Sequence, residues 1–165
     1  MAEFVEKKYV KPNSIEKRDY QINLANQAIE ENCIVVLPTG LGKTAVALHV
    51  ISEYLSKGTG GILFLAPTRV LVNQHYEFLK NNLTLDDISI ITGEDTIQKR
   101  TKLWNNSVIC ATPEITKNDF DRGIVSPDQF NLVIFDEVHR TVGDYAYSGI
   151  AQRFEDSNAR IVGMT

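Results

Sequence analysis

The sequence predicts an α/β domain in which helices cover both faces of a mostly parallel sheet. Short apolar runs rich in β-branched residues recur along the 165 residues, as expected for strands buried inside a sheet. Segments with a helical spacing of apolar residues separate most of these runs. Such an alternation of strands and helices is typical of a parallel sheet that is covered on both faces.

The chain begins with a segment that precedes the first helical pattern. Residues 1–13 contain several Lys and Glu residues and are predicted to form an extended lead-in. Residues 14–165 are predicted to form the folded domain. Its first helix carries Tyr20, Leu24 and Ala28 on one face, at the spacing of an amphipathic helix.

Six apolar runs are predicted to be strands. They span residues 33–37, 62–66, 88–92, 108–111, 132–136 and 161–164. The first run, Cys-Ile-Val-Val-Leu, has the composition of a strand buried on both faces. After it, Leu48, Ile51 and Leu55 form a helical stripe that ends before Gly58. A second helical stripe spans residues 71–79.

A Gly-rich turn joins the first predicted strand to the next helix. From position 37 to position 44 the chain reads Leu-Pro-Thr-Gly-Leu-Gly-Lys-Thr. Gly40 and Gly42 allow a tight turn that directs successive backbone N–H groups at phosphate oxygens, near the positive end of the helix dipole. Lys43 would reach the β- and γ-phosphates, and the Thr44 hydroxyl would bind Mg²⁺. The alternative is a structural turn with an incidental lysine.

Asp136 and Glu137 come at the end of the strand predicted over residues 132–136. The carboxyl end of a parallel strand is where such sheets place ligand-binding side chains. Asp136 could hold the Mg²⁺ shell, and Glu137 could position or deprotonate the attacking water. An isolated Asp-Glu pair is usually a solvated strand end, but together with the Gly-rich turn it predicts hydrolysis of a nucleoside triphosphate.

The composition indicates one soluble domain. With 43% hydrophobic residues, the chain can bury a core of its own. It has no run of 18 apolar residues and no N-terminal hydrophobic signal, which predicts an intracellular, cytoplasmic protein, nucleoid-associated in a prokaryote, without membrane contact. Cys33 and Cys110 lie in apolar runs and are predicted to be buried thiols in a reducing compartment.

The Pro-Thr-Gly-x-Gly-Lys-Thr form of the turn closely resembles the phosphate loop of superfamily 2 helicases and translocases. Five further segments resemble motifs of that superfamily, in the expected order. They are the adenine-side glutamine motif at 18–21, three nucleic-acid-facing loops at 66–69, 92–94 and 111–114, and the beginning of the coupling motif at 163–165. The resemblance implies a RecA-like P-loop NTPase domain that uses ATP and Mg²⁺.

The motifs and the resemblance together give the predicted site residues. The catalytic residues are Lys43, Asp136 and Glu137, with Thr44 and Asp136 at Mg²⁺. The nucleotide-binding residues are Arg18, Gln21, Leu37, Pro38, Thr39, Gly40, Leu41, Gly42, Lys43 and Thr44. The nucleic-acid contacts are Pro67, Thr68, Arg69, Thr92, Gly93, Thr112 and Pro113. The coupling residues are His139 and Thr165.

The segment from Asp136 to Tyr147 resembles one branch of the superfamily. It is similar to the archaeal Hef helicases and the Fanconi-anaemia-type M translocases, in which the same His-basic-x-x-Gly-x-Tyr-Ala-Tyr pattern follows the acidic box. These proteins remodel forked and branched DNA, so the resemblance implies such DNA as a partner. It also implies a second RecA-like domain in the same polypeptide, without which this domain should bind ATP but hydrolyse it poorly.

Several other side chains are predicted to be structural. His49 and His75 lie within helical patterns and are predicted to pack or to face solvent. Trp104 closes a helix and is predicted to be a core or lid residue. Tyr145 and Tyr147 are predicted to pack a helix onto the sheet.

The charge leaves the mode of nucleic-acid binding open. The 17 Lys and Arg residues against 21 Asp and Glu residues give a net charge of −4, which is not the footprint of a protein that grips many phosphates. One account uses backbone N–H groups and hydroxyls, with Arg69 as a local charge. The other assigns most of the affinity to the second domain.

Two other functions stay open from the sequence. One is an RNA-directed ATPase of the same superfamily, which would use identical ATP chemistry on a different polynucleotide. The other is a non-catalytic scaffold that keeps the nucleotide-binding fold. The presence of Lys43, Thr44, Asp136 and Glu137 argues against the scaffold.

Overall fold

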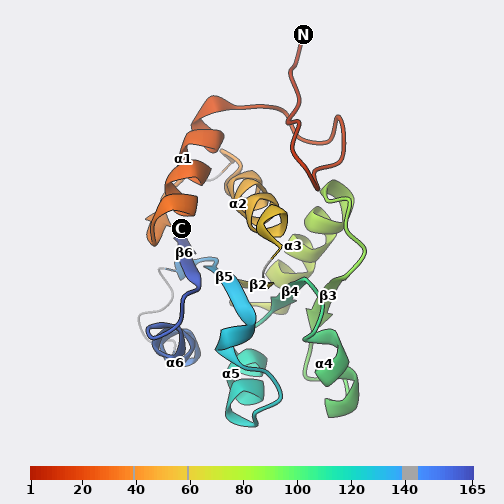
Figure 1. The fold of residues 1–165 in the computed structure, drawn as a ribbon, viewed down its shortest axis with the longest axis vertical. Helices are drawn as coiled ribbons and strands as arrows, with labels where there is room; N and C mark the ends of the chain where they lie inside the picture. Colours follow the sequence, from red (N-terminus) through yellow and green to blue (C-terminus); the bar gives the residue numbers. More distant parts are fainter. Residues whose placement is uncertain (39, 59, 139–144) are drawn as a thin grey trace.

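The fold is a parallel sheet between two layers of helices (Figure 1). The computed structural model describes residues 1–38, 40–58, 60–138 and 145–165, without the side chain of Tyr145. Within them the strands are β1 (Cys33–Val35), β2 (Gly61–Leu65), β3 (Ile88–Ile91), β4 (Val108–Ala111), β5 (Phe130–Phe135) and β6 (Arg160–Met164). All six predicted strands are present, with ends shifted by at most two residues.

The strand order decides which loops become neighbours. The sheet runs β1-β6-β5-β2-β4-β3, and each pair of neighbours is parallel. The carboxyl ends of all strands therefore lie at one edge. At this edge, the loops after β1, β6 and β5 occupy one half, and the loops after β2, β4 and β3 occupy the other.

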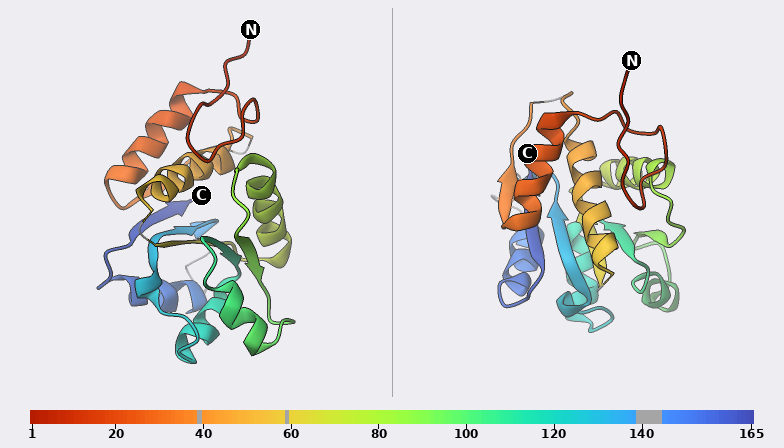
Figure 2. Two further views of the ribbon diagram at one scale, coloured as in Figure 1. Left: turned by 45° about the vertical axis from the view of Figure 1, so that its right-hand side comes forward. Right: turned by 45° about the horizontal axis from the view of Figure 1, so that its top comes forward.

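The helices are divided between the two faces of the sheet. They are α1 (Asp19–Glu30), α2 (Lys43–Lys57), α3 (Arg69–Asn82), α4 (Ile97–Leu103), α5 (Pro113–Asp121) and α6 (Tyr145–Phe154), with a 3₁₀ turn at Pro127–Gln129. Figure 2 shows α1, α2 and α3 over one face and α4, α5 and α6 over the other. Each layer has its own apolar core, because strand side chains alternate between the faces.

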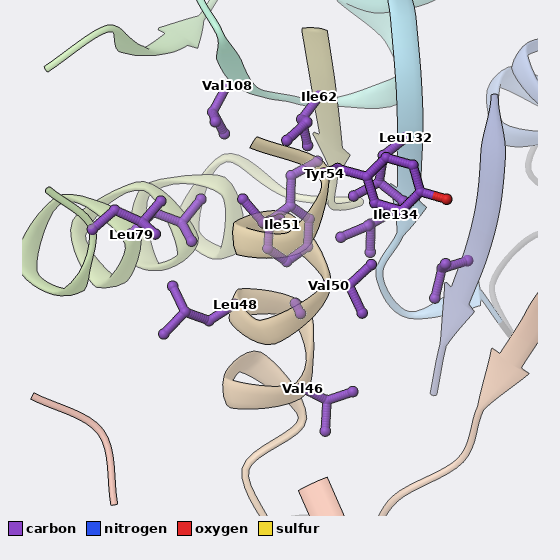
Figure 3. Packing of buried hydrophobic residues seen from close by; sticks show 14 of the residues in the cluster. Val46, Leu48, Val50, Ile51, Tyr54, Ile62, Leu79, Val108, Leu132 and Ile134 are labelled. Carbon is purple, nitrogen blue, oxygen red and sulfur yellow. The ribbon is translucent and has the colours of Figure 1, made fainter. Parts of the chain in front are cut away.

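Helix α2 is the centre of the first core. Its side chains pack against Ile62 of β2, Leu132 of β5 and Leu79 of α3 (Figure 3). It ends at Gly58, whose φ of 67° is left-handed, as the predicted stop requires. Because α2 is buried over most of its length, its first residue is held rigidly at the edge where the strands end.

Strand β1 differs from its prediction. The prediction that it is buried on both faces was wrong, because Ile34 is 61% exposed and Val36, just after the strand, is 68% exposed. Val35 is buried in the core, and Cys33, which was predicted to be buried, is half-buried and packs against it. The reason is the position of β1 at the end of the sheet, where β6 is its one neighbour among the described strands.

The predicted lead-in packs onto the domain. Val5 and Val10 are buried and belong to the first core. The backbone of Val5 bonds to Ile15, and isolated bridges join Phe4 to Glu16 and Val10 to Leu83. The boundary at residue 13 stays a prediction. None of the described helices is long and apolar enough to cross a membrane.

Candidate active site and nucleic-acid groove

The phosphate loop follows β1 and leads directly into α2. Gly40 and Gly42 have φ angles of 88° and 82°, in the left-handed region that glycine tolerates. Gly42 is also the N-cap of α2, and among the described residues no side chain caps this helix end. The backbone N–H groups at the start of α2 therefore form a natural position for an anion.

Lys43, the first residue of α2, faces the carboxylates at the end of β5. Its Nζ lies 2.8 Å from Asp136 Oδ1 and 3.1 Å from Glu137 Oε1. The Lys43 side chain is 24% exposed and that of Asp136 is 2% exposed, so the cluster is largely shielded from water. These residues meet because β1 and β5 both flank β6 in the sheet.

The charges in this cluster hold one another in the ionised form. Burial lowers the pKa of the Lys43 ammonium, but the Asp136 and Glu137 carboxylates outweigh burial and raise it above its usual value. Burial raises the pKa of the Asp136 carboxyl, but a hydrogen bond from His75 and the Lys43 ammonium outweigh burial and lower it. Near neutral pH the pocket therefore contains a charged lysine and a charged aspartate.

The backbone of Asp136 is fixed on both sides. Its N–H donates to the Leu65 carbonyl at 2.8 Å, and its carbonyl accepts from the Tyr147 hydroxyl at 2.6 Å. Tyr147 is fully buried and packs edge-on against Phe135, which confirms its predicted packing onto the sheet. Glu137 has a φ of 55°, a strained conformation that is concentrated at functional sites.

His75 is a residue of this site that the sequence reasoning missed. Of its two predicted alternatives, packing is confirmed, because His75 is buried and stacks on Phe64. Its contact with the site was not predicted: its Nε2 lies 2.7 Å from Asp136 Oδ2. A carboxylate only accepts, so the Nε2–H donates. Leu71, His75 and Leu79 are four residues apart and share the inner face of α3, and this spacing could have indicated a buried histidine.

Gln21, predicted on the adenine side, packs on the phosphate loop. It is buried, and its Nε2 donates to the Leu41 carbonyl at 3.1 Å. The Tyr20 hydroxyl donates to the same carbonyl at 2.8 Å. A Cβ added to Gly42 would come within 2.3 Å of Gln21 Nε2, so Gln21 and a glycine at this position fit together. Recognition of adenine by Gln21 stays a prediction.

A pocket of about 630 Å³ lies between the phosphate loop, α3 and the end of β5. The predicted residues in its lining are Leu37, Pro38, Gly40, Gly42, Lys43, Thr44, Asp136, Glu137 and Thr165. Leu71, Gln74 and His75 of α3 line it as well. Arg18, Gln21 and Leu41 are outside this lining. Arg18 is the N-cap residue of α1, where its side chain makes no capping bond to the described N–H groups, and it pairs with Glu16 at 2.7 Å.

Thr165, one of the two predicted coupling residues, is held against the segment that leads into the phosphate loop. Its N–H donates to the Val35 carbonyl at 3.0 Å, and its carbonyl accepts from the Leu37 N–H at 3.1 Å. A displacement of Thr165 would therefore shift the backbone of Leu37, where the phosphate loop begins. Thr39 and His139, the other predicted coupling residue, lie outside the described residues.

The predicted nucleic-acid loops follow β2, β3 and β4 and meet in a groove of about 490 Å³. The predicted residues in its lining are Pro67, Arg69, Thr92, Gly93, Thr112 and Pro113. Thr68 is not in the lining; it is the N-cap of α3, and its hydroxyl accepts the Leu71 N–H at 3.2 Å. Thr112 is the N-cap of α5, and its hydroxyl caps no N–H there.

The groove carries little positive charge. Among the described residues in its lining, Arg69 is the one basic side chain, beside Glu94 and Glu114. Arg69 pairs with Glu94 at 3.1 Å, and both side chains are largely exposed. The pairing lowers the pKa of the Glu94 carboxyl. Such an exposed pair contributes little energy and is easily exchanged for another partner.

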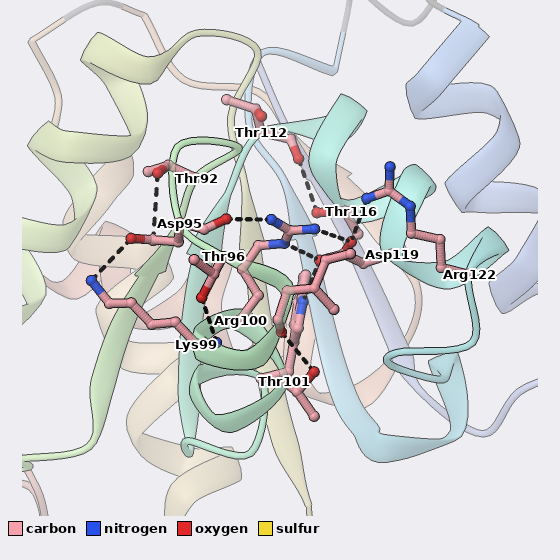
Figure 4. Close-up of polar contacts among 12 residues, drawn as sticks. Thr92, Asp95, Thr96, Lys99, Arg100, Thr101, Thr112, Thr116, Asp119 and Arg122 are labelled. Atoms are coloured by element: carbon pink, nitrogen blue, oxygen red, sulfur yellow. Dashed lines mark hydrogen bonds and ion pairs between the residues drawn. The ribbon is translucent and has the colours of Figure 1, made fainter.

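A buried ion pair supports the groove from below (Figure 4). Arg100 of α4 donates twice to the Asp119 carboxylate of α5, at 2.8 and 3.1 Å, and once to the Asp95 carbonyl at 2.6 Å. Trp104, a core residue as predicted, also donates to Asp119, at 2.9 Å. Asp95 in turn accepts from the Thr92 hydroxyl at 3.4 Å. The network ties the loop after β3 to the helix that starts at the loop after β4.

Comparison with known proteins now decides the family. A family model described as DEAD/DEAH box helicase matches residues 18–165. The chain belongs to this family. The helicase domain has the RecA-like α/β fold that the sequence predicted.

Individual relatives agree with the branch predicted from the sequence. The Pyrococcus furiosus Hef helicase domain superimposes with a TM-score of 0.84 at 40% identity, over 90% of this chain and 33% of that one. The ATP-dependent DNA helicase MPH1 of Candida albicans is 36% identical over 96% of this chain. A putative ATP-dependent RNA helicase, MJ1505 of Methanocaldococcus jannaschii, is 42% identical over 98% of it. The chain spans 21% of MJ1505 and 14% of this MPH1.

Proposed function

We propose that this helicase domain is the ATP-binding half of a motor that moves on DNA and acts on forked or branched substrates. The observation that carries the motor assignment is the pairing of Lys43 with Asp136 and Glu137 in a pocket beside the groove. DNA is proposed as the substrate because the DNA helicase MPH1 is among the relatives, and forked or branched DNA because residues 136–147 resemble the Hef and Fanconi-anaemia-type M proteins. An intracellular, cytoplasmic location stays a prediction.

The residues of the pocket suit triphosphate binding. Lys43 and the N–H groups at the start of α2 would hold the phosphates of ATP. Lys43 would then exchange its carboxylate partners, which lie 2.8 and 3.1 Å away, for phosphate oxygens. The Lys43 side chain is 24% exposed, so its ammonium lies within reach of a ligand that enters the pocket.

The carboxylates suit Mg²⁺. Asp136 Oδ1 is buried, and within the described part of the chain its partner is the Lys43 ammonium at 2.8 Å. Such an oxygen, together with the Thr44 hydroxyl in the pocket lining, fits the oxygen ligands that Mg²⁺ prefers. When bound, Mg²⁺ neutralises charge that develops on the phosphates. Glu137 would orient the attacking water and accept its proton.

A second RecA-like domain would complete the site. In P-loop GTPases, an arginine supplied in cis or by a partner protein stabilises charge on the transferring phosphoryl group and raises the rate by about 10³–10⁵. The helicase domain alone is therefore expected to bind ATP and to hydrolyse it poorly. Closure and opening of the two domains on ATP turnover would move the motor along the strand.

The groove suits contact with a nucleic-acid backbone. It offers the Thr92 and Thr112 hydroxyls, the start of α5 and one exposed arginine. Contacts of this kind position a strand but carry no sequence information. Binding by this domain should therefore be weak, sequence-independent and only moderately sensitive to salt.

The second candidate function is an RNA-directed ATPase. It is favoured by one observation, the 42% identity to a protein described as a putative ATP-dependent RNA helicase. The ATP pocket would work in the same way in either case. Only the polynucleotide in the groove would differ.

The test is the ATPase rate of the full-length protein with forked DNA, single-stranded DNA and double-stranded RNA. Strong stimulation by forked DNA, and little by RNA, is the expected result. Stimulation by RNA but not by DNA would favour the second candidate, the RNA-directed ATPase. No ATPase activity under any of these conditions would contradict both and favour a non-catalytic scaffold.

A further inference from the structure

A buried hydrogen bond without an assigned role joins helix α3, which begins at the groove, to the end of β5 in the ATP pocket. His75 of α3 and Asp136 after β5 are 61 residues apart in sequence, and their side chains meet at 2.7 Å. Both are buried, with 6% and 1% exposure. A buried hydrogen bond between a ring N–H and a carboxylate is short, strong and strongly oriented.

The imidazole ring is held in one orientation. It stacks on Phe64 of β2 with ring centroids 4.4 Å apart and an angle of 10° between the ring planes. The stacking fixes the ring plane, and the hydrogen bond fixes its direction within that plane. His75 therefore takes up Asp136 Oδ2 and leaves Oδ1 facing Lys43 and the pocket.

The same helix begins at the nucleic-acid groove. Thr68 caps its N-terminus, and Arg69, its first residue, lines the groove. Two helical turns separate Thr68 from His75, a distance of about 10 Å at 1.5 Å per residue. Val72 and Leu79 are buried in the core and hold these turns against the sheet. We therefore expect this part of α3 to move as a rigid unit.

We propose that His75 is a positioning residue that orients Asp136 for the metal and transmits the position of the groove end of α3 to the ATP pocket. A strand bound at Arg69 would shift or stiffen α3, and His75 would carry that change to the carboxylate. This inference rests on the proposed function. Partners that orient metal ligands in this way commonly contribute 10- to 100-fold to metal affinity.

The variant His75→Leu in the full-length protein removes the hydrogen bond and keeps an apolar side chain against Phe64. We expect the affinity for Mn²⁺, measured by electron paramagnetic resonance with a non-hydrolysable ATP analogue, to fall by about tenfold or more. We also expect the maximal stimulation of the ATPase by forked DNA to fall by a similar factor. The affinity for forked DNA in the absence of nucleotide should stay within about twofold, since the groove itself is unchanged.

Two further variants separate positioning from packing. His75→Gln keeps an N–H donor of similar reach and should restore Mn²⁺ affinity to within about threefold of the unmodified protein. If His75→Leu does not fold, His75→Ala replaces it as the variant without a donor, and His75→Gln is compared with that variant instead. Tyr76→Leu changes the neighbouring, half-buried residue of α3 and should leave Mn²⁺ affinity and stimulation unchanged.

The outcomes that overturn the inference are distinct from those that overturn the proposed function. If His75→Leu matches Tyr76→Leu in Mn²⁺ affinity, His75 only packs. If Mn²⁺ affinity falls but stimulation by DNA is retained, the link to the groove is wrong. If the unmodified protein shows no stimulation by any nucleic acid, the proposed function fails, and the Mn²⁺ measurement still decides whether His75 orients Asp136.

Discussion

Two ion pairs of equal length show how differently the pocket and the groove are built. Lys43 lies 3.1 Å from Glu137 in the pocket, and Arg69 lies 3.1 Å from Glu94 in the groove. The side chains of the first pair are each 24% exposed, whereas those of the second are 61% and 76% exposed. Water screens the second pair far more strongly, so equal distance does not mean equal energy.

The difference corresponds to two kinds of work. The pocket places a few charges in a fixed, shielded arrangement, which is what stabilisation of a developing charge requires. The groove offers exposed groups that can exchange partners, which would suit the repeated release of a strand that the proposed movement along DNA requires. Single substitutions in the pocket should therefore have large effects on catalysis, and those in the groove should have small effects on binding.

The largest effect is expected at Lys43. Lys43→Ala in the full-length protein should lower the kcat/KM of the nucleic-acid-stimulated ATPase by about 10³, because a charge aimed at the phosphates is lost. Lys57→Ala, at the other end of α2, is the control and should stay within about twofold. A loss of less than tenfold at Lys43 would mean that the pocket is not catalytic in the way proposed.

The next effect concerns the support below the groove. Asp119→Leu should lower the free energy of unfolding by about 3 kcal/mol, since it leaves the Arg100 guanidinium buried without its carboxylate. The double variant Arg100→Met with Asp119→Leu should recover more than half of that loss. Urea unfolding measures both. Asp121→Leu, an exposed residue of the same helix, is the control, and a loss as large as that at Asp119 would contradict a special role for the buried pair.

A smaller effect is expected at the phosphate loop, where two glycines can be compared. Both have left-handed φ angles, so alanine should cost about 1 kcal/mol of stability at either. Gly42→Ala should cost about 1 kcal/mol more, because its Cβ would displace the Gln21 amide from the Leu41 carbonyl. Thermal unfolding measures the difference. Equal losses of stability at Gly40 and Gly42 would show that the Gln21 side chain moves away from the new Cβ at no cost.

The smallest effect is expected in the groove. Arg69→Ala should weaken binding of single-stranded DNA by less than about tenfold and reduce the salt slope by about one phosphate contact. Glu94→Gln should act in the opposite direction by about twofold, because it releases Arg69 from its carboxylate partner. Fluorescence anisotropy at several salt concentrations measures both. A 100-fold loss of DNA affinity in Arg69→Ala would contradict the proposed difference, in which single groove residues contribute little to binding.

What the sequence could predict follows from what is local. The six strands were predicted because an apolar run rich in β-branched residues indicates a strand at any position in the sheet. Lys43 and its two carboxylate partners, Asp136 and Glu137, were predicted because each lies in a local sequence motif. The exposure of Ile34 could not be found this way, since it depends on β1 being at the end of the sheet.

The missed features are contacts between distant elements. The His75–Asp136 bond needs α3 to lie beside the end of β5, and the Arg100–Asp119 pair needs α4 and α5 to be neighbours. Both contacts depend on the order of the strands in the sheet, which cannot be predicted from any single sequence motif. Spacing along α3 could have indicated that His75 is buried, but not which carboxylate it meets.

The most direct test of the account is linkage between the two regions. The affinity of the full-length protein for a non-hydrolysable ATP analogue would be measured with and without saturating forked DNA, and its affinity for the DNA with and without the analogue. The account predicts that each ligand changes the affinity for the other by the same factor, at least about fivefold. Affinities that are unchanged in both directions would contradict it, because the pocket and the groove would then work independently.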